Sequence, residues 1–183
     1  IADAMVKNVG NFNHQRALKA CTNTANVRYF DGLGDYIDYK YVPDDKSHSS
    51  VSKTLEYAYN DWCIAQIAAK AEKSETAAEY MKRSEYYKNV FDPSSGFMRP
   101  KMSDGLFRKN FDPMDTHGQG FIEGNAWNYG LYVPQDIPNM IELMGGKKRF
   151  SYHLDSLFAM EIADKYIDQH EDITRDGIIG NYV

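Results

Sequence analysis

The part of this sequence that most constrains its fold is a long helical pattern from about Ser50 to Lys70. Apolar and aromatic residues recur there at steps of three and four, the end of the segment is rich in alanine, and Ser50 can cap the start. The residues on this face are Val51, Leu55, Ala58 or Tyr59, Trp62, Gln66 and Ala69. We therefore predict a helix over this whole segment.

A second helical pattern starts at Ser74 and continues to Phe91. Its face is formed by Ala77, Tyr80, Met81, Ser84, Tyr87 and Phe91. The segment Asp92–Gly96 contains Pro and Gly, which end a helix. Because only a few residues separate the two patterns, we expect two antiparallel helices that form a helical hairpin.

The N-terminal part of the chain has a weaker helical pattern, from Ala2 to about Cys21, with an interruption near Gly10. The glycines between Asp31 and Asp35 then break the chain. Between residues 96 and 113 the pattern becomes short and irregular, which predicts a small β-hairpin or a loop excursion.

Helical signals return after Asn125, within limits set by Pro134 and Pro138, and continue to a double glycine at 145–146 suited to a left-handed C-cap. A further helix is expected from about Lys147 to Lys165, and the end of the chain, 176–183, reads as a loop. No run of residues is long enough for a strand of a central sheet. The predicted fold class is therefore all-α, built from helical hairpins with long connections.

Composition narrows the class of protein further. The 183 residues suit one domain or a piece of one. The net charge of −5 argues against a chain whose main function is to bind nucleic acid. No apolar run reaches the roughly 18 residues of a membrane-spanning helix. The 14 tyrosines fit either ordinary core and surface positions or the walls of a cleft for polar ligands, such as sugars.

The strongest catalytic and metal motifs are absent from the sequence, among them a P-loop, a dinucleotide fingerprint, a zinc-protease motif and a nucleophile elbow. Asp112, Asp115 and His117 place three potential ligands within six residues, but a solvated loop is the favoured interpretation, so no metal ligands are assigned. Cys63 lies in an apolar helical pattern and is expected to be a small buried side chain rather than a catalyst or half of a disulfide.

The segment 117–129 contains the remaining candidates for catalytic or binding residues. Glu123, Asn125 and Trp127 lie close together between a glycine-rich loop and a helical signal. A carboxyl group beside an indole can have its neutral form favoured by desolvation, as a general acid requires. The alternative is that Glu123 complements a helix dipole, Asn125 caps that helix and Trp127 is a core residue.

Several segments, taken in order, resemble glycoside hydrolase family 92. They are Ser50–Cys63, Asp92–Arg99, Glu123–Trp127, Val133–Asp136 and Leu143–Gly146. The resemblance covers roughly Tyr39 to Phe158 and implies an exo-acting, inverting and calcium-dependent α-mannosidase. It also implies a catalytic domain that is an (α/α)6 toroid, preceded in the family by a β-sandwich domain.

The same resemblance implies roles for individual residues. Glu123 occupies the position of the general acid, while Asn125, Trp127, Gln135 and Asp136 are candidates for contact with an α-mannose-containing glycan. Each of these four also has a purely structural interpretation, as a helix cap, a core residue or a residue on a loop surface. Gln135 stands where the family usually has histidine and Leu131 where it usually has tryptophan, and both departures bear on linkage preference.

The family's catalytic base lies in a downstream Gly-Asn-Asp-Asp motif, which does not occur in this sequence. We therefore expect residues 1–183 to form part of a longer catalytic domain, with the calcium ligands mostly outside this chain and the remaining parts of that domain as partners. Taken alone, such a piece is expected to be inactive and to expose Leu, Phe and Tyr side chains or self-associate. The resemblance also implies a periplasmic, cell-surface or secreted location. The alternative function is a non-catalytic helical module for carbohydrate binding or interaction.

Overall fold

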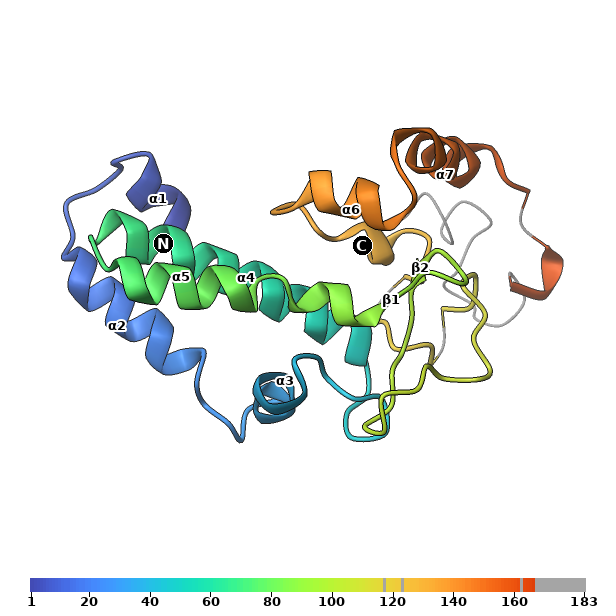
Figure 1. Cartoon of the computed structure of the whole chain (residues 1–183), viewed down its shortest axis with the longest axis horizontal. Helices are drawn as coiled ribbons and strands as arrows, with labels where there is room; N and C mark the ends of the chain where they lie inside the picture. Colours follow the sequence, from blue (N-terminus) through green and yellow to red (C-terminus); the bar gives the residue numbers. More distant parts are fainter. Residues whose placement is uncertain (117, 123, 162, 167–183) are drawn as a thin grey trace.

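The computed structural model describes residues 1–116, 118–122, 124–161 and 163–166, and Figure 1 shows how their elements are arranged. The α-helices are α1 (Ala2–Val6), α2 (His14–Thr24), α3 (Leu33–Tyr39), α4 (Ser50–Lys70), α5 (Ser74–Arg83), α6 (Ile137–Leu143) and α7 (Lys147–Ala159). Three short 3-10 helices, η1 (Tyr86–Val90), η2 (Tyr129–Leu131) and η3 (Asp164–Tyr166), and two strands, β1 (Phe91–Asp92) and β2 (Phe97–Met98), complete the described elements. The predicted all-α class is confirmed.

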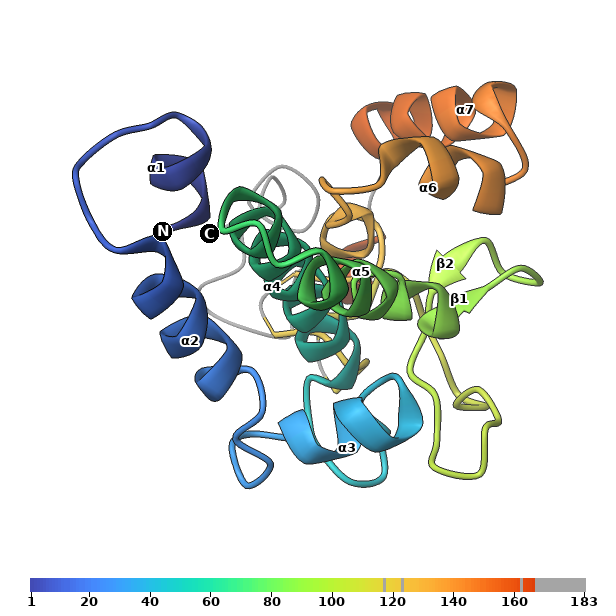
Figure 2. The ribbon, with the colours of Figure 1, turned by 60° about the vertical axis from the view of Figure 1, so that its left-hand side comes forward.

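The expected hairpin of two long helices is the centre of the molecule, with α4 and α5 lying side by side (Figures 1 and 2). Helix α4 has the predicted bounds, but the predicted cap at Ser50 is wrong. Ser50 is the first helical residue, and its hydroxyl donates to Asp44 Oδ1 at 2.8 Å. The carbonyl of Gly120 accepts hydrogen bonds at the start of α4, from the N–H groups of Val51 and Ser52. A distant loop therefore caps this helix.

The helix expected from Ser74 to Phe91 ends early, at Arg83. The chain continues as η1 and then enters the hairpin of β1 and β2, in which Phe91 pairs with Met98 and Asp92 with Phe97. The predicted helical face thus continues into a tertiary contact, in which the carbonyl of Val90 accepts from the N–H of Arg99 at 2.8 Å, across the hairpin. The predicted hairpin is therefore present but starts before residue 96, and the isolated bridge between Lys101 and Phe107 extends the excursion.

Asp92 fixes the turn of that hairpin through its carboxylate. One oxygen accepts from the backbone N–H and the hydroxyl of Ser94, and the other accepts from Arg99 Nη1 at 2.9 Å. Burial opposes the charged form, but the hydrogen bonds from Ser94 and Arg99 prevail and lower the pKa of Asp92 to about 2.

The two N-terminal helices pack against the C-terminal half of α4. The predicted interruption near Gly10 is confirmed, and Asn13 caps α2 by accepting from the N–H of Arg16 at 2.9 Å. Helix α2 ends at Thr24, three residues beyond the predicted end. The buried residues of this contact form one cluster, namely Met5, Leu18, Ile64, Ala65, Ile67, Ala68, Ala71 and Tyr80.

A buried ion pair joins α4 to the end of α5. Arg83 Nε donates to Asp61 Oδ2 at 3.0 Å, and the hydroxyl of Tyr36 donates to the same oxygen at 2.9 Å. The guanidinium also donates to Asn26 Oδ1 and to the carbonyl of Ala25, both at 3.2 Å. Burial raises the pKa of Asp61 to about 6, while Arg83 and Tyr36 act in the opposite direction. The carboxylate of Asp61 thus links α3, α4 and α5, and the guanidinium of Arg83 adds the residues just after α2.

The C-terminal described part consists of the neighbouring helices α6 and α7. Gly145 and Gly146 have φ of 90° and 94° and end α6, so the predicted C-cap is confirmed. After Asn125, however, only η2 is helical before α6. Helix α7 ends at Ala159 rather than at Lys165, since Met160 is extended, and η3 is held by the hydroxyl of Tyr166, which donates to Asp112 at 2.7 Å. The expected loop at 176–183 lies outside the described residues.

The largest core surrounds the N-terminal half of α4. It includes residues from α4, η1, both strands, η2 and α6, together with Phe121, Ala126 and Val133 from the loops between. Large side chains also lie in solvent, with Tyr29, Tyr152 and Phe158 at 93 %, 75 % and 85 % exposure. The expected exposure of Phe and Tyr is thus found, along with an exposed Leu106.

Candidate active site

The residues just before the predicted general acid, 120–122, are attached to the start of α4. The carbonyl of Gly120 caps α4, and the N–H of Ile122 donates to the hydroxyl of Ser52 at 3.1 Å. Phe121 is buried in the main core. Glu123 itself lies outside the described residues, so the prediction that it is the general acid stays a prediction.

Gly120 explains why this attachment is close. Its φ is +82°, and an added Cβ would lie 2.6 Å from Pro100 Cγ and 3.0 Å from Val51 Cγ2. Only glycine has both the left-handed conformation and the missing side chain that this approach of backbone to helix requires.

Asn125 is fully buried and organises the turn that follows it. Its Oδ1 accepts from the N–H of Trp127 at 2.9 Å and of Asn128 at 3.4 Å, and its Nδ2 donates to the carbonyl of Met114 at 3.1 Å. Its own N–H donates to Asn128 Oδ1 at 2.8 Å. These contacts close a turn, which gives Asn125 a structural role, but the cap of η2 is Asn128, whose Oδ1 accepts from the N–H of Tyr129 at 2.7 Å.

Trp127 is half-buried and lies among aromatic rings. Its ring stacks on His153 of α7, with 4.5 Å between centroids and 20° between planes. Phe97 of β2 meets it edge-on at a centroid distance of 4.9 Å. The indole is therefore fixed by two other elements of the fold but keeps part of its surface in solvent.

Gln135 and Asp136 are adjacent in the chain but differ in their surroundings. Both polar atoms of the Gln135 amide are shielded from solvent and have no hydrogen-bond partner in the described part of the chain. Asp136 precedes α6 and accepts from the hydroxyl of Tyr87 at 2.8 Å and from Asn139 Nδ2 at 2.9 Å. Asp136 thus has a structural role, whereas Gln135 is a buried amide whose pairing needs an explanation.

The fold joins Asn125 to Trp127 through a hydrogen bond, while Asp136 bonds to η1 and α6 instead. Sequence reasoning missed His153 and Phe97, which contact Trp127. His153 lies three residues after Phe150 and one before Leu154 on the predicted apolar face of its helix, so the helical period could have found it. Nothing in the sequence places Phe97 beside Trp127.

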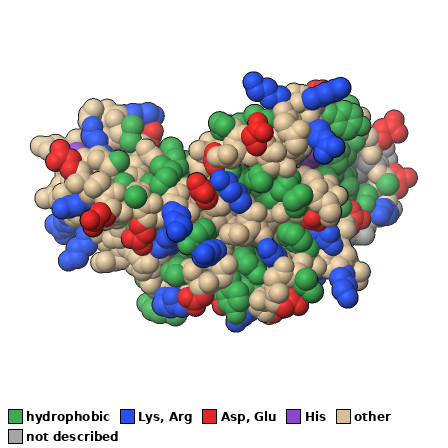
Figure 3. Space-filling view, in the orientation of Figure 1, with side chains coloured by type: hydrophobic (Ala, Val, Ile, Leu, Met, Phe, Trp, Pro, Cys, Tyr) green, Lys and Arg blue, Asp and Glu red, His purple; other side chains and the backbone are tan. Residues whose placement is uncertain are grey.

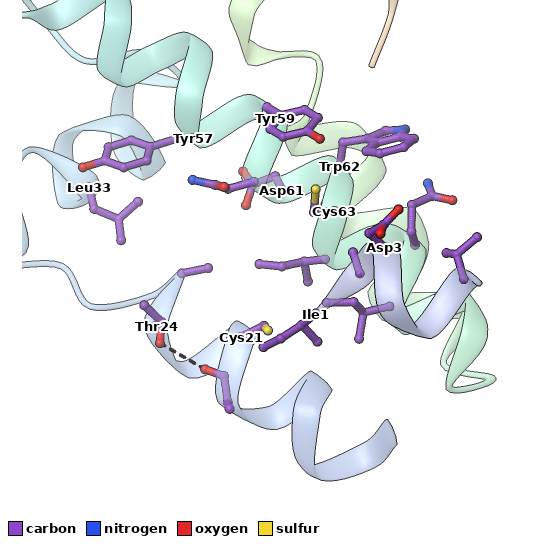
Figure 4. A pocket seen from close by; sticks show the side chains of 18 of the residues that line it. Ile1, Asp3, Cys21, Thr24, Leu33, Tyr57, Tyr59, Asp61, Trp62 and Cys63 are labelled. Carbon is purple, nitrogen blue, oxygen red and sulfur yellow. Dashed lines mark hydrogen bonds between the residues drawn. The ribbon is translucent and has the colours of Figure 1, made fainter. Parts of the chain in front are cut away.

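A cavity lies elsewhere in the molecule. It has a volume of about 850 Å³ and is enclosed by α1, α2 and α4 (Figure 4). Its wall is mostly apolar and includes Leu33, Tyr57, Tyr59 and Trp62. Asn125, Trp127, Gln135 and Asp136 do not line this cavity, so it is separate from the candidate site.

The two cysteines also lie on the wall of this cavity, and both are unpaired. Cys63, expected to be a small buried side chain, is half-buried. Burial raises the pKa of its thiol, against the hydrogen bond with Tyr59, and so favours the unreactive protonated form.

The acidic loop around Asp112 is more ordered than expected. Asp112 accepts from the hydroxyl of Tyr166 and from the N–H of Met114 at 3.0 Å, and Lys165 Nζ lies 3.5 Å away. Burial opposes ionisation, but these contacts lower the pKa of Asp112. His117 lies outside the described residues. Within the described ranges, no group of three or more His, Cys, Asp and Glu side chains could hold a metal ion.

Two further observations concern the surface. Acidic, basic and apolar side chains are intermixed on the face shown in Figure 3. Among the helices of the described residues, none is long and apolar enough to cross a membrane.

Comparison with known proteins defines the class of protein. Residues 1–182 match the model of the glycosyl hydrolase family 92 catalytic domain. The chain belongs to this family, and the resemblance that the sequence predicted is confirmed.

Particular relatives sharpen this assignment. The structure of the family GH92 α-mannosidase BT3965 from Bacteroides thetaiotaomicron is 41 % identical, with a TM-score of 0.83, over 87 % of this chain and 21 % of that chain. A second structure of BT3965, in complex with mannoimidazole, is 38 % identical over 89 % of this chain and 22 % of that chain, with a TM-score of 0.84.

Two more relatives come from a bacterium and a fungus. The family GH92 inverting mannosidase BT2199 of Bacteroides thetaiotaomicron is 32 % identical over 92 % of this chain and 24 % of that chain, with a TM-score of 0.82. An uncharacterized secreted glycosidase of Arthroderma benhamiae is 28 % identical over 195 residues, which is 86 % of this chain and 25 % of that protein. The chain therefore spans about a fifth to a quarter of the length of these relatives.

Proposed function

We propose that this chain is part of the catalytic domain of an inverting exo-α-mannosidase that removes terminal α-linked mannose from glycans. The observation that carries the proposal is the match of residues 1–182 to the family 92 catalytic domain, supported by the likeness to two solved mannosidases of that family. Membership in a glycoside hydrolase family defines the bond that is cut, and the relatives suggest the sugar.

In this proposal Glu123 is the general acid. An inverting glycosidase needs a carboxylic acid that protonates the leaving oxygen and a second carboxylate, roughly 6.5–9.5 Å away, that activates water. The backbone of Gly120 and Ile122 is attached to α4, which gives the loop of Glu123 a rigid base. The second carboxylate is proposed to come from another part of the catalytic domain.

The substrate contacts proposed for this chain are Trp127 and Gln135, and the other two candidates, Asn125 and Asp136, are proposed to support them. A half-buried indole offers a flat apolar surface to a sugar ring. The shielded and unpartnered amide of Gln135 favours a polar ligand, since a sugar hydroxyl can both donate to Oε1 and accept from Nε2. Asn125 and Asp136 already bond to the chain itself, so their contribution is to hold the loops in place.

The partial (α/α)6 toroid is proposed on similar grounds. The α4–α5 hairpin is the repeating unit of such a ring, and an apolar cavity between α1, α2 and α4 offers a surface that another helical segment of the same domain can cover. Export from the cytoplasm, as implied by the relative described as secreted, belongs to the same proposal.

Calcium dependence is proposed for the longer protein only. The described residues contain no cluster of potential ligands that fits a metal ion, so they assign no residue and no catalytic step to calcium.

The test uses the protein that carries this chain, purified with Glu123→Gln or with Glu142→Gln. Glu142 is an exposed carboxylate on α6 and serves as the matched control. We expect Glu123→Gln to lower the hydrolysis of an unactivated mannobioside by roughly 10²–10⁴-fold, because proton donation to the leaving group is lost. An aryl mannoside with a good leaving group should lose much less.

Unchanged mannobioside hydrolysis in Glu123→Gln would refute the assignment of the acid. Absence of α-mannosidase activity in the unaltered protein would refute the proposed function itself. The isolated 183-residue chain is expected to be inactive.

A further inference from the structure

Three aromatic rings from separate parts of the chain meet at Trp127. The imidazole of His153 lies almost parallel to the indole at 4.5 Å, and the ring of Phe97 stands edge-on to it at 4.9 Å. Phe97 and His153 also contact each other, with a centroid distance of 5.4 Å. The stack on one face and the contact at an edge leave the indole little freedom to rotate.

The backbone of Trp127 is fixed separately from its side chain. Its N–H donates to the buried Asn125, whose own Nδ2 bonds to the carbonyl of Met114. The tryptophan is thus held by a hydrogen bond at its backbone and by two rings at its side chain, which come from β2 and α7.

His153 contributes to this cluster as a flat ring rather than as a hydrogen-bonding group. Its Nε2 is shielded from solvent and has no hydrogen-bond partner in the described part of the chain. Burial lowers the pKa of His153, so the ring is neutral near pH 7. A phenylalanine would present a similar flat face, so the contact with Trp127 does not depend on the ring nitrogens.

We propose that His153 and Phe97 are positioning residues that hold the Trp127 indole as a surface against which a sugar ring of the substrate stacks. This inference rests on the proposed function, because it takes the ligand to be an α-mannoside. A prepositioned platform binds the sugar without first losing the rotational freedom of a large side chain.

The first experiment measures, without any sugar, how firmly His153 and Phe97 hold the indole of Trp127. The chain has two tryptophans, so a Trp62→Phe background leaves Trp127 as its sole tryptophan, which is excited at wavelengths that tyrosine does not absorb. In that background His153→Ala should lower the fluorescence anisotropy of Trp127 and increase its quenching by acrylamide. His153→Phe should keep both values near those of the parent, and Tyr152→Ala, which alters an exposed residue of the same helix, should change neither.

The second experiment measures the effect on substrate in the full-length enzyme. We expect His153→Ala and Trp127→Ala each to raise KM for an α-mannoside about tenfold, the size of one lost aromatic stacking contact, with a smaller change in kcat. Because His153 acts through Trp127, the double variant should be no worse than Trp127→Ala alone. His153→Phe should restore KM to within about threefold of the unaltered enzyme.

The outcomes separate the two proposals. The positioning role is overturned if the increases in KM caused by His153→Ala and Trp127→Ala multiply in the double variant. It is also overturned if His153→Ala leaves the fluorescence anisotropy of Trp127 unchanged. An unaltered enzyme that hydrolyses no α-mannoside overturns the proposed function and, with it, the sugar platform. If the unaltered enzyme is active and Trp127→Ala leaves KM for the α-mannoside unchanged, only the proposed stacking surface is overturned.

Discussion

The buried pair of Asp61 and Arg83 allows a stability prediction with a defined magnitude. The side chains are 2 % and 8 % exposed, and their nearest polar atoms are 3.0 Å apart. Arg83→Met keeps the length and the apolar packing of the side chain but leaves the Asp61 carboxylate with Tyr36 as its remaining hydrogen-bond donor. Removing one partner of such a pair costs about 3–5 kcal/mol, because the other charge stays buried.

Urea unfolding followed by far-ultraviolet circular dichroism measures this loss. With a slope of about 2 kcal/mol/M, the midpoint of Arg83→Met should fall by roughly 1.5–2.5 M at pH 8. Asp61→Asn/Arg83→Met removes both charges and keeps an acceptor for Tyr36, so it should recover most of the loss. The double variant is the matched control for changes in packing.

The dependence on pH provides an independent check. Without Arg83 the folded-state pKa of Asp61 should rise above its present value of about 6, whereas in the unfolded chain it is close to 3.8. A raised folded pKa means that the folded state binds the proton more tightly, so the variant gains stability as pH falls through that pKa. The penalty should shrink by up to about 1.4 kcal/mol per pH unit. A midpoint within about 0.3 M of the parent at pH 8, which is less than 1 kcal/mol, would refute the reasoning.

Three further predictions concern the candidate site and the hairpin beside it. Because the folded-state pKa of Asp92 is lowered to about 2, its contribution of about 2 kcal/mol to the free energy of unfolding is present above pH 4 and is lost as pH falls toward 2. Asp92→Asn should abolish this loss of stability between pH 4 and pH 2. Gly120→Ala should cost about 1–3 kcal/mol in urea unfolding, since its Cβ would lie 2.6 Å from Pro100, and an unchanged midpoint would contradict the close packing there. Gln135→Leu should raise the thermal midpoint by removing two buried unpaired atoms, yet lower kcat/KM for α-mannosides at least tenfold; a variant that is both less stable and equally active would show that the amide serves the fold.

Local patterns in the sequence were sufficient to predict the helices that depend on local periodicity. Helix α4 occupies Ser50 to Lys70 as predicted, and the double glycine ends α6. The motif order was also sufficient for the family, because five short segments in the right sequence are far more specific than any one of them. The periodicity could not show where a helix ends and the following residues form tertiary contacts instead.

The failures of prediction share one cause. Helix α5 ends at Arg83 and the chain goes on to Val90, whose carbonyl bonds across the hairpin; α7 ends at Ala159 and the chain goes on to Tyr166, which bonds to Asp112. The start of α4 is capped by Gly120, about 70 residues away in sequence, rather than by its own serine. Hydrogen bonds between distant residues have no periodic signature in a single sequence.

The sequence by itself determined the helical hairpins, the family and the identity of Glu123, Asn125, Trp127, Gln135 and Asp136 as candidates. Only the tertiary structure decided which of them bond to the chain itself and which present a surface or an unpartnered amide. It placed Asn125 where its amide closes a turn and surrounded Trp127 with rings from two other elements. The physical reason is that burial and hydrogen-bond pairing depend on neighbours brought from far along the chain, whereas helix formation depends mainly on residues within one or two turns.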